Sequence, residues 1–475
     1  MPQSRNRKSS HAAKRSPGRR ATPRQAPALR PETQSQCLTL TVDSLNSEGQ
    51  GVARRGREVY FVPGALAGEE VDVVLDGRRK KVWQTRLRKV IQPSDQRVEP
   101  GCPHYHKCGG CDLQHLSYAA QVAAKQARVE RELHRQHIEV DHWQAAITAD
   151  PWHYRRKARL GVRCSKTDGQ VYIGFRESSS SHITNIDRCQ VLVDHAVLDW
   201  QAWRELLTTF DHPDRISQIE VIQADNALAL VVRELKPLSG ADRQRLVAFI
   251  ERFDDPAVQL WLKSSDAVTC LVPHQEAEGL FHRVQDLELS MGLDDFIQVN
   301  AAVNRAMVDQ ALSWLAPKQD DVVWDLFAGH GNFSMPLAKL SQQVVAVEVQ
   351  DSMVDSLRRQ AEKLALPLLG KKADLSQPEC LAGLPQPHAV LLDPPRAGAA
   401  EVSDALVQRQ VPRIVYVSCD VATLARDLAK LCGAGYRVVK AGIMDMFPQT
   451  HHVETMVLLE YTAGTKQQHQ KKHES

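Results

Sequence analysis

The pattern of apolar and polar residues changes along the chain, and each pattern predicts a different kind of structure. Residues 36–92 hold short alternating runs such as Glu70-Val-Asp-Val-Val-Leu, with glycine turns between them. Short strands at this spacing predict a small closed barrel. From Phe296 onward, short apolar runs alternate with helical patterns, which indicates a doubly wound parallel sheet.

The region between these two parts mixes strand and helix patterns, and a long helix is expected over residues 112–137. Strands are expected at 171–175, 219–222 and 228–232, and further helices near 193–209 and 240–252. Basic and aromatic residues alternate at 152–159, which is typical of a nucleic-acid surface or of a solvated strand face. We therefore expect a central α+β domain over residues 93–290 and a Rossmann-like α/β domain over residues 291–463.

Composition narrows the class of protein. Of the 475 residues, 43% are hydrophobic and 25% are charged, as in ordinary soluble chains. No run reaches the roughly 18 apolar residues of a membrane span, and no apolar segment follows the basic N-terminus as it would in a signal peptide. We expect a cytoplasmic protein whose ten cysteines are thiols or metal ligands, without a membrane or an obligate protein partner.

Both ends of the chain are expected to be disordered. Residues 1–31 hold nine lysines and arginines and no acid, which leaves about −6 on the rest of a chain whose net charge is +3. The arm 1–35 is also rich in Ser, Pro and Gln, which bury too little surface to fold. A basic arm suits RNA phosphates, or it serves solubility alone. The polar tail 464–475 is expected to be disordered as well.

Three cysteines stand close together in the glycine-rich stretch Cys102-Pro-His-Tyr-His-Lys-Cys108-Gly-Gly-Cys111. In a cytosolic protein such spacing is more typical of metal ligands than of unrelated thiols. The nearest candidate for a fourth ligand is Cys189, and Cys164 is its rival. Four thiolates suit zinc or an iron–sulfur cluster, and the two histidines between the first two cysteines are alternative zinc ligands.

A second group of residues predicts a nucleoside site in the C-terminal part. The strand expected at 321–327 leads into Ala328-Gly329-His-Gly331, and the next strand ends in Glu348, 19 residues after Gly329. In a Rossmann-like fold the glycines let the backbone approach the nucleoside, and the acid binds the ribose hydroxyls. Because Ser334 stands where the dinucleotide motif has its third glycine, S-adenosylmethionine is favoured over a dinucleotide.

Three further strands are expected to end in residues that carry chemistry. One delivers Cys419, a second ends in Asp393-Pro-Pro-Arg396, and His451-His-Val-Glu454 opens the last. Ligand sites of open α/β sheets lie at such strand ends. A thiol and two acids suit addition of a thiolate to carbon 6 of uracil, which makes carbon 5 reactive toward a methyl donor, and later removal of the carbon 5 proton. Without these neighbours, a cysteine at such a position is more often a small buried apolar residue than a nucleophile.

These motifs carry two resemblances. Gly49-Gln-Gly-Val-Ala53 and Phe61-Val-Pro-Gly-Ala65 make residues 36–92 similar to a TRAM domain, an OB-like barrel that binds RNA. Over residues 36–461 the chain resembles the RNA uracil-5-methyltransferase family, and within it the bacterial type that modifies 23S ribosomal RNA. The likeness rests on Cys102-x5-Cys108-x2-Cys111, Gln298-Val-Asn300, Asp325-Leu-Phe-x-Gly-x-Gly-Asn-Phe333, Asp393-Pro-Pro-Arg396, Val417-Ser-Cys419 and His452-Val-Glu454.

The family resemblance implies a role for each of these residues. Cys419 would be the nucleophile, and Glu454 would be the base that removes the carbon 5 proton. Contacts to S-adenosylmethionine would come from Gln298, Phe327, Asn332, Glu348, Asp374 and Asp393. A [4Fe–4S] cluster, which separates this type from the related tRNA enzyme, would be held by Cys102, Cys108, Cys111 and Cys189.

Two positions depart from the family pattern. Asp420 and Val421 follow the nucleophile where Asn-Pro is usual, and Gln190 stands where proline is common. We expect the carboxylate of Asp420 to disfavour the thiolate beside it. Three alternative functions remain: uracil methylation of another RNA such as tRNA, methylation of an exocyclic amino group, and non-catalytic ribosome assembly. Arg396 argues against the amino-group enzymes, which usually carry an aromatic residue there.

Overall fold

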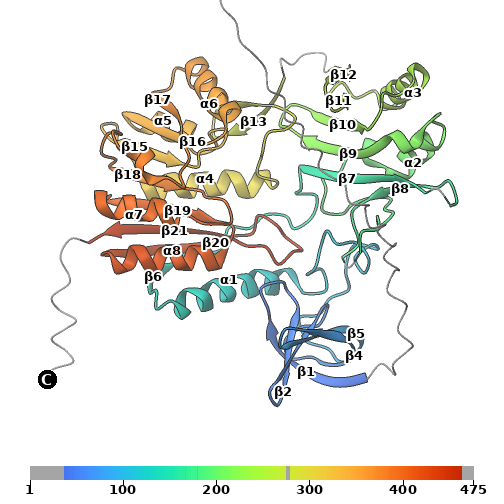
Figure 1. Cartoon of the computed structure of the whole chain (residues 1–475), viewed down its shortest axis with the longest axis horizontal. Helices are drawn as coiled ribbons and strands as arrows, with labels where there is room; N and C mark the ends of the chain where they lie inside the picture. Colours follow the sequence, from blue (N-terminus) through green and yellow to red (C-terminus); the bar gives the residue numbers. More distant parts are fainter. Residues whose placement is uncertain (1–36, 166, 179, 274–278, 463–475) are drawn as a thin grey trace, which may run out of the picture.

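The computed structural model describes residues 37–165, 167–178, 180–273 and 279–462 (Figure 1). Three β-structures organise these residues: a small barrel, a six-stranded sheet and an eight-stranded sheet. In Figure 1 the barrel lies below the other two, which stand side by side. The segments 1–35 and 464–475, which we expect to be disordered, lie outside the described residues. Among the helices in the described ranges, none is long and apolar enough to span a bilayer.

The barrel predicted for the N-terminal part is confirmed. Its strands, in spatial order, are β1 (Cys37–Leu45), β2 (Gly51–Arg55), β3 (Glu58–Val62), β5 (Val82–Gln92) and β4 (Glu70–Arg79). Neighbouring strands are antiparallel except β3 and β5. Alternating side chains point inward, so that Val42, Val62, Val71 and Val73 are buried in its core.

The central sheet has the strand order β12-β11-β10-β9-β7-β8. Its strands are β7 (Lys157–Cys164), β8 (Val171–Gly174), β9 (Ile216–Gln223), β10 (Leu228–Glu234), β11 (Val258–Lys263) and β12 (Val268–Val272). Its helices are α2 (Trp200–Thr208) and α3 (Gly240–Glu251), with 3₁₀ turns η1 (Ala196–Leu198) and η2 (Pro213–Arg215). Trp200, Trp203 and Phe249 pack between helices and sheet. The two expected helices are thus confirmed.

The eight-stranded sheet has the order β17-β16-β15-β18-β19-β21-β20-β6. Its C-terminal strands are β15 (Val322–Leu326), β16 (Gln343–Glu348), β17 (Leu368–Lys372), β18 (Ala389–Leu392), β19 (Arg413–Ser418), β20 (Tyr436–Met444) and β21 (Glu454–Tyr461). Its helices are α4 (Ala301–Leu315), α5 (Ser334–Leu340), α6 (Asp351–Lys363), α7 (Ala400–Arg409) and α8 (Val421–Gly433), with the 3₁₀ turn η3 (Pro378–Leu381). Strands β17, β16, β15, β18 and β19 run parallel to one another, which confirms the doubly wound arrangement, whereas β21 is antiparallel to β19.

The last strand of this sheet comes from much earlier in the chain. Helix α1 (Tyr118–Arg135) packs against α8 and β20, and β6 (Val140–Trp143) pairs in parallel with β20 at the sheet edge (Figure 1). Val129 and Leu133 of α1 lie in the apolar cluster that covers one face of the sheet. The helix begins at Tyr118 rather than at residue 112, because the amides of Asp112 and Leu113 bind the carbonyl oxygen of Gln449.

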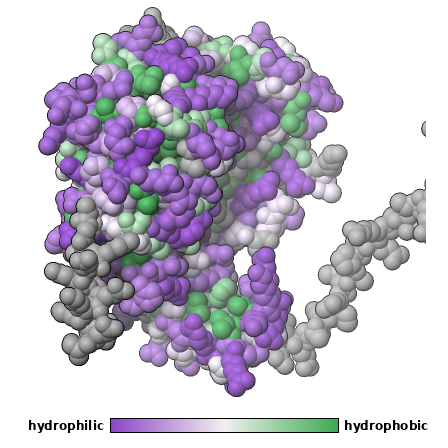
Figure 2. Space-filling view, turned by 60° about the vertical axis from the view of Figure 1, so that its left-hand side comes forward, coloured by the Kyte–Doolittle hydropathy of each residue, from purple (hydrophilic) through white to green (hydrophobic). Residues whose placement is uncertain are grey.

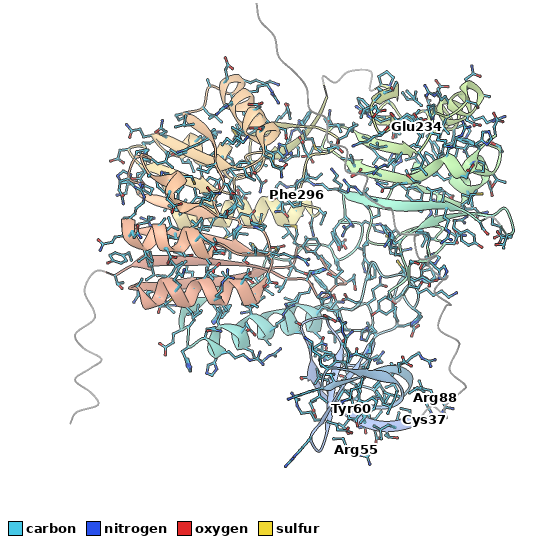
Figure 3. All side chains as sticks on the ribbon, in the orientation of Figure 1. Cys37, Arg55, Tyr60, Arg88, Glu234 and Phe296 are labelled. Atoms are coloured by element: carbon cyan, nitrogen blue, oxygen red, sulfur yellow. The ribbon has the colours of Figure 1, made fainter. Side chains whose placement is uncertain are left out.

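A hairpin of β13 (Leu280–Val284) and β14 (Leu287–Met291) precedes the C-terminal sheet. Just after it, Phe296 lies between the central sheet and the C-terminal sheet (Figure 3), and 66% of its surface is exposed. Phe296 is two residues before Gln298, so its exposed ring lies in the segment that leads into α4, beside one of the residues expected to bind the methyl donor.

Candidate active site

The register of two strands brings Cys419 and Glu454 together. Strands β19 and β21 are antiparallel, and Ser418 at the end of β19 lies opposite Thr455 of β21. Cys419 follows Ser418 and Glu454 precedes Thr455, so these two residues face each other. They lie at the edge of the sheet where the parallel strands β18 and β19 end. Strand β21 begins at Glu454 rather than at His451 as the sequence predicted, because residues 451–453 belong to a loop held by α1 and the segment before it.

Asp393 and Arg396 reach the same edge from the neighbouring strand. Leu392 of β18 pairs with Tyr416 of β19, and Asp393 follows Leu392 directly. The loop after Asp393 is fixed by Asp427 of α8, whose carboxylate accepts hydrogen bonds from the amide of Ala399 (2.7 Å) and from the hydroxyl of Tyr416 (2.8 Å). Asp393 and Cys419 therefore follow the carboxyl ends of β18 and β19, and Glu454 stands beside them at the start of the antiparallel strand β21, where ligand sites of such sheets lie.

The groups at this edge shift one another's pKa values. Burial, together with the charge of Asp393, raises the pKa of Glu454 to about 8, while Arg396 acts in the opposite direction. Burial raises the pKa of Asp393 to about 7. Burial and then the charges of Glu454 and Asp393 raise the pKa of the Cys419 thiol to about 11. Perturbed acids of this kind cluster at catalytic sites.

Asp420, the residue after Cys419, caps the helix that follows it. Asp420 is the N-terminal cap of α8, and its Oδ1 accepts hydrogen bonds from the amides of Ala422 and Thr423, both at 3.0 Å. The charges that raise the pKa of Cys419 are those of Glu454 and Asp393. Cys419 itself stands just before the helix N-terminus, where the aligned peptide dipoles favour a thiolate.

The glycine loop, residues 328–331, is hydrogen-bonded to Glu348. One carboxylate oxygen of Glu348 accepts a hydrogen bond from the amide of Gly329 (3.1 Å), and the other accepts from Val349 (2.8 Å) and Gln350 (3.0 Å). Gly329 has φ +55°, and a Cβ built on it meets no atom within 4 Å, so the space above this turn is open.

Gly331 has a different role. A Cβ at this position would come within 2.9 Å of Leu357 and 3.1 Å of Met335, so the glycine allows α5 and α6 to pack closely. Phe327, at the start of the loop, has φ +66°, a left-handed conformation that is uncommon for an aromatic residue. Such backbone strain occurs at ligand sites when the surroundings hold it in place.

The other residues expected to contact the methyl donor surround this loop. Asn332 and Asn304 exchange two hydrogen bonds between their side-chain amides, at 2.9 and 3.0 Å. The carbonyl oxygen of Gln298 accepts a hydrogen bond from Arg156 Nε (2.7 Å). Asp374 is exposed after β17, and hydrogen bonds from the side chain of Ser376 and then from its amide (2.9 Å) lower the pKa of the Asp374 carboxyl.

Arg156 and Lys157 do not form the nucleic-acid surface suggested by the alternating residues 152–159. Arg156 is 4% exposed, and Lys157 donates hydrogen bonds to the carbonyl oxygens of Leu293 (3.0 Å) and Asp295 (2.7 Å). Both cations therefore hold the segment that leads into Gln298. Sequence alone could not separate this arrangement from an exposed basic strand, because the acceptors are backbone atoms about 140 residues away.

The loop before Glu454 is held by residues that the sequence did not single out. Asp112 accepts hydrogen bonds from the amide of His451 (2.8 Å) and from its ring Nδ1 (2.5 Å). Gln121 exchanges two hydrogen bonds with Gln449, at 3.0 and 2.9 Å. The buried ammonium of Lys125 binds Asp445 at 2.6 Å. The only sequence signal for Asp112 is its place directly after Cys111.

The four cysteines predicted as metal ligands line one cavity of about 150 Å³. All ten cysteines of the chain lie within the described residues and are free thiols. The cavity is lined by Cys102, Cys108, Cys111 and Cys189, with Arg155, Phe175 and Gln190 among its other walls, whereas Cys164 lies elsewhere at the end of β7. Burial raises the pKa of Cys111, and the charges of Cys189 and the other two thiols act in the same direction.

The loop that carries three of these cysteines is tied to the neighbouring segments. The amide of Gly109 binds the carbonyl oxygen of Arg176 (2.9 Å), and the amide of Asp187 binds His104 Nε2 (3.4 Å). His104 therefore fastens the loop near Cys189. Within the described residues, no group of three or more Cys, His, Asp or Glu side chains is gathered as ligands of a metal ion. The [4Fe–4S] cluster stays a prediction.

Comparisons with known proteins agree with this geometry. The family model described as tRNA (Uracil-5-)-methyltransferase matches residues 117–366 and 385–462, and the TRAM domain model matches residues 31–80. The chain is 41% identical over 425 residues to a protein of Pseudomonas putida, covering 89% of this chain and 93% of that protein. It is 38% identical over 459 residues to one of Pectobacterium atrosepticum, covering 95% and 98%. Both relatives are named 23S rRNA (uracil(1939)-C(5))-methyltransferase RlmD.

A solved structure shares the fold over most of the chain. It is the tRNA (uracil-54, C5)-methyltransferase of Pyrococcus abyssi in complex with S-adenosyl-L-homocysteine, with a TM-score of 0.67 and 22% identity. The match covers 89% of this chain and 99% of that one. The TRAM match and this structural match confirm the barrel and the methyltransferase fold expected from the sequence.

Proposed function

The chain belongs to the tRNA (Uracil-5-)-methyltransferase family, and we propose that it transfers a methyl group from S-adenosylmethionine to carbon 5 of a uridine in 23S ribosomal RNA. Membership makes it an RNA uracil-5-methyltransferase that depends on S-adenosylmethionine. The choice of RNA is supported by relatives at 38–41% identity whose names specify uracil 1939 of 23S rRNA. The tRNA enzyme of Pyrococcus abyssi is only 22% identical, so a tRNA substrate is the weaker alternative.

The observation that carries the mechanism is the pairing of a thiol with an acid across β19 and β21. In the proposed reaction the Cys419 thiolate bonds to carbon 6 of uracil, and carbon 5 becomes nucleophilic. S-adenosylmethionine, when bound, supplies the methyl group. Glu454 then removes the carbon 5 proton, the bond between sulfur and carbon 6 breaks, and the Cys419 thiolate is released.

The pKa of Glu454 suits the second half of this sequence. A carboxylate whose pKa is raised to about 8 by burial holds a proton more strongly than an exposed carboxylate, so it is a stronger base once ionised. Arg396 lies close enough to both Glu454 and Cys419 to stabilise their charged forms. His452 does not supply this positive charge, because burial lowers the pKa of its ring to about 4.

The residues around the glycine loop fit S-adenosylmethionine. The turn at Gly329 is open above its Cα, and the adjoining carboxylate of Glu348 is positioned by three backbone amides. We propose that the donor is held by Gln298, Phe327, Asn332, Glu348, Asp374 and Asp393. A positively charged sulfonium near Asp393 would be favoured by that carboxylate.

We further propose that Cys102, Cys108, Cys111 and Cys189 hold a [4Fe–4S] cluster. The donor set fits, since four free thiols line one cavity and the charges of the other three act on Cys111. Four thiolates are the usual ligands of such a cluster. Methyl transfer requires no electron transfer, so the role of the group would be to fix the loop at 102–111 against Cys189.

Methylation of defined RNAs tests the proposal. Purified protein, labelled S-adenosylmethionine and a 23S rRNA fragment that spans the uridine corresponding to uracil 1939 should yield 5-methyluridine at that position alone. Replacement of that uridine by cytidine should abolish incorporation. Label transferred to tRNA but not to the 23S fragment would favour the tRNA alternative, and label on an exocyclic amino group would contradict the use of Cys419. No transfer to any RNA would point to the non-catalytic role.

A further inference from the structure

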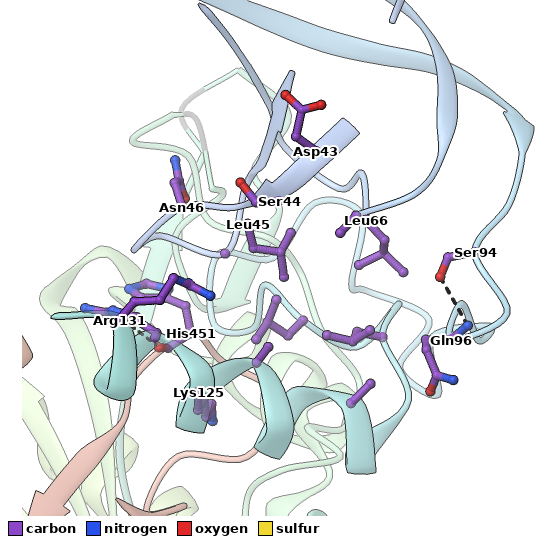
Figure 4. A pocket seen from close by; sticks show the side chains of 17 residues that line it. Asp43, Ser44, Leu45, Asn46, Leu66, Ser94, Gln96, Lys125, Arg131 and His451 are labelled. Carbon is purple, nitrogen blue, oxygen red and sulfur yellow. Dashed lines mark hydrogen bonds between the residues drawn. The ribbon is translucent and has the colours of Figure 1, made fainter. Parts of the chain in front are cut away.

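A second cavity lies outside the catalytic edge, between the barrel, α1 and the loop that precedes Glu454 (Figure 4). Its volume is about 330 Å³, within the range of roughly 300–1,000 Å³ that is common for small-ligand pockets. Much of its wall is apolar: Leu45 and Leu66 come from the barrel side, and Leu113, Leu116 and Ala124 from the side of α1. In Figure 4, Leu45 and Leu66 point toward the helix.

One end of this cavity is basic. Arg131 and His451 lie together there (Figure 4), and Arg128 joins them in the wall. Arg128 Nη1 donates hydrogen bonds to the carbonyl oxygens of Ser47 (3.0 Å) and His451 (3.3 Å), so its guanidinium is fixed, while Arg131 is exposed. The acid in the wall, Asp43, points away from the cavity in Figure 4.

The basic end adjoins both halves of the catalytic pair. His451 precedes Glu454 by three residues, and burial lowers the pKa of Arg128 while the carboxylate of Asp420, next to Cys419, opposes that shift. If one RNA strand occupied both places, a nucleotide in this cavity would therefore be close along the strand to the nucleotide at Cys419. Figure 2 shows hydrophobic side chains gathered on the lower part of the molecule, where the barrel lies, among mostly hydrophilic residues.

We propose that this cavity binds an unpaired nucleotide of the substrate RNA next to the target uridine. Its base would lie on the apolar wall, and its phosphate would meet Arg128 and Arg131. An apolar surface with two guanidinium groups at one end matches the two parts of a nucleotide, and single-stranded RNA is recognised through such splayed bases. The inference rests on the proposed function, because only an RNA substrate links the two sites.

Filling the cavity tests the proposal in the full-length protein. Ala124 lines the cavity, whereas the neighbouring Ala123 is exposed and outside its wall. Ala124→Phe should raise the Kd for a 23S rRNA hairpin that spans the target uridine by about tenfold, the order expected when roughly 50 Å² of apolar contact between a base and the wall is lost. Ala123→Phe should bind this RNA like the wild type, and both variants should bind S-adenosylmethionine normally. Equal RNA affinity of the two variants would overturn the inference.

A charge variant covers the case in which Ala124→Phe fails to fold. Arg131 is exposed, so its removal leaves the fold intact, and Arg135 on the same helix is a matched control that lies outside the cavity wall. Arg131→Ala should reduce the slope of log Kd against log salt by about one, as for loss of one phosphate contact. An unchanged slope, or an equal change in Arg135→Ala, would contradict a phosphate at this end.

Cross-linking identifies the occupant. A photoreactive phenylalanine in place of Gln96, which lines the cavity but is exposed and therefore leaves the apolar wall unfilled, should cross-link to a nucleotide adjacent to the target uridine. Cross-links only to the protein itself, for example to residues 1–36, would overturn the proposal and identify the N-terminal arm as the occupant. A wild-type protein that methylates no 23S fragment refutes the proposed function. A wild type that methylates the fragment, together with variants that bind it normally, refutes this inference alone.

Discussion

Ser418 and Thr455 lie opposite each other in the last pair of β19 and β21, and this register makes Cys419 and Glu454 neighbours. A shift of one residue would turn every following side chain of the strand to the other face of the sheet. The geometry of the nucleophile and the base is therefore set by the same backbone hydrogen bonds that build the core. Glu454 is also paired on its other side, with Met444 of β20, which restricts its movement further.

Removal of the thiol should abolish methyl transfer without changing the binding of S-adenosylmethionine. Cys419→Ala is expected to abolish methylation while S-adenosylmethionine binds with unchanged affinity, because the thiol acts on uracil. Calorimetry with the donor and transfer of labelled methyl groups to RNA measure the two effects. Cys270→Ala, which changes a half-buried thiol on β12, is the control. Turnover above a few per cent of wild type in Cys419→Ala would remove Cys419 from the mechanism.

Loss of the base should trap the reaction after methyl transfer. Glu454→Gln keeps the size and hydrogen-bonding capacity of the side chain but not its basicity, so the carbon 5 proton stays in place. A positioned base contributes about 10²–10⁴-fold. The variant should therefore accumulate a methylated protein–RNA adduct that survives denaturing electrophoresis. The additional change Cys419→Ala should eliminate this adduct. If Glu454→Gln simply fails to bind RNA, the glutamate positions the substrate and the base lies elsewhere.

The raised pKa of Glu454 also predicts how stability depends on pH. The folded protein holds this proton up to about pH 8, whereas the unfolded chain releases it near 4.5. Folding is therefore penalised increasingly as the pH rises from 4.5 to 8. Glu454→Gln should raise the free energy of unfolding at pH 8, by a few kcal/mol at most (about 1.4 kcal/mol per pKa unit), and have little effect at pH 4.5. Urea unfolding at both pH values measures this, and an equal effect at both would contradict it.

The cysteine cavity predicts a coloured protein. Anaerobic preparations should be brown and contain about four irons per chain if a [4Fe–4S] cluster is bound. Cys111→Ala should lose this iron, while Cys164→Ala should keep it, because Cys164 lies outside the cavity. Iron analysis and the visible spectrum provide the measurement. A colourless, active protein with stoichiometric zinc would replace the cluster by a zinc site.

Asp112 should matter for the base although it lies on the other side of the loop. Its two hydrogen bonds to His451 hold the segment that leads to Glu454. Asp112→Ala should slow proton removal and leave a methylated RNA adduct, as in Glu454→Gln but to a smaller extent. Asp141→Ala, which breaks an ion pair with Arg437 at 3.0 Å, is the control. A general loss of stability without adduct would show that Asp112 serves only the fold.

Local sequence patterns predicted the barrel, the doubly wound sheet and the strand ends that carry Cys419, Asp393 and Glu454. These features depend on the alternation of apolar and polar residues, on glycine turns and on short apolar runs, each of which can be recognised within a few residues of sequence. Contacts between distant segments left no such signal. Asp112 and His451 are 339 residues apart, and Lys125 and Asp445 are 320 apart.

The same limit explains the residues whose roles differ from expectation. Arg156 resembled part of an RNA surface because its acceptor is a backbone oxygen, which sequence composition does not record. The role of Asp420 as the cap of α8 was not predicted, because a cap depends on the direction in which the carboxylate points; its expected effect on the Cys419 thiolate stays a prediction. In both cases the sequence shows that the side chain is charged, but it does not show which atoms that side chain contacts in the fold.

The place of β6 at the edge of the eight-stranded sheet has a consequence during synthesis. β6 ends at Trp143, and its partner β20 begins only at Tyr436. At roughly 5–20 residues per second, the ribosome needs on the order of 15–60 s to make the intervening chain. For that time the apolar face of α1, with Val129 and Leu133, has no sheet to cover it. The barrel and the central sheet, each built from one continuous stretch of sequence, can fold during this time, whereas α1 is covered only after the C-terminal strands emerge.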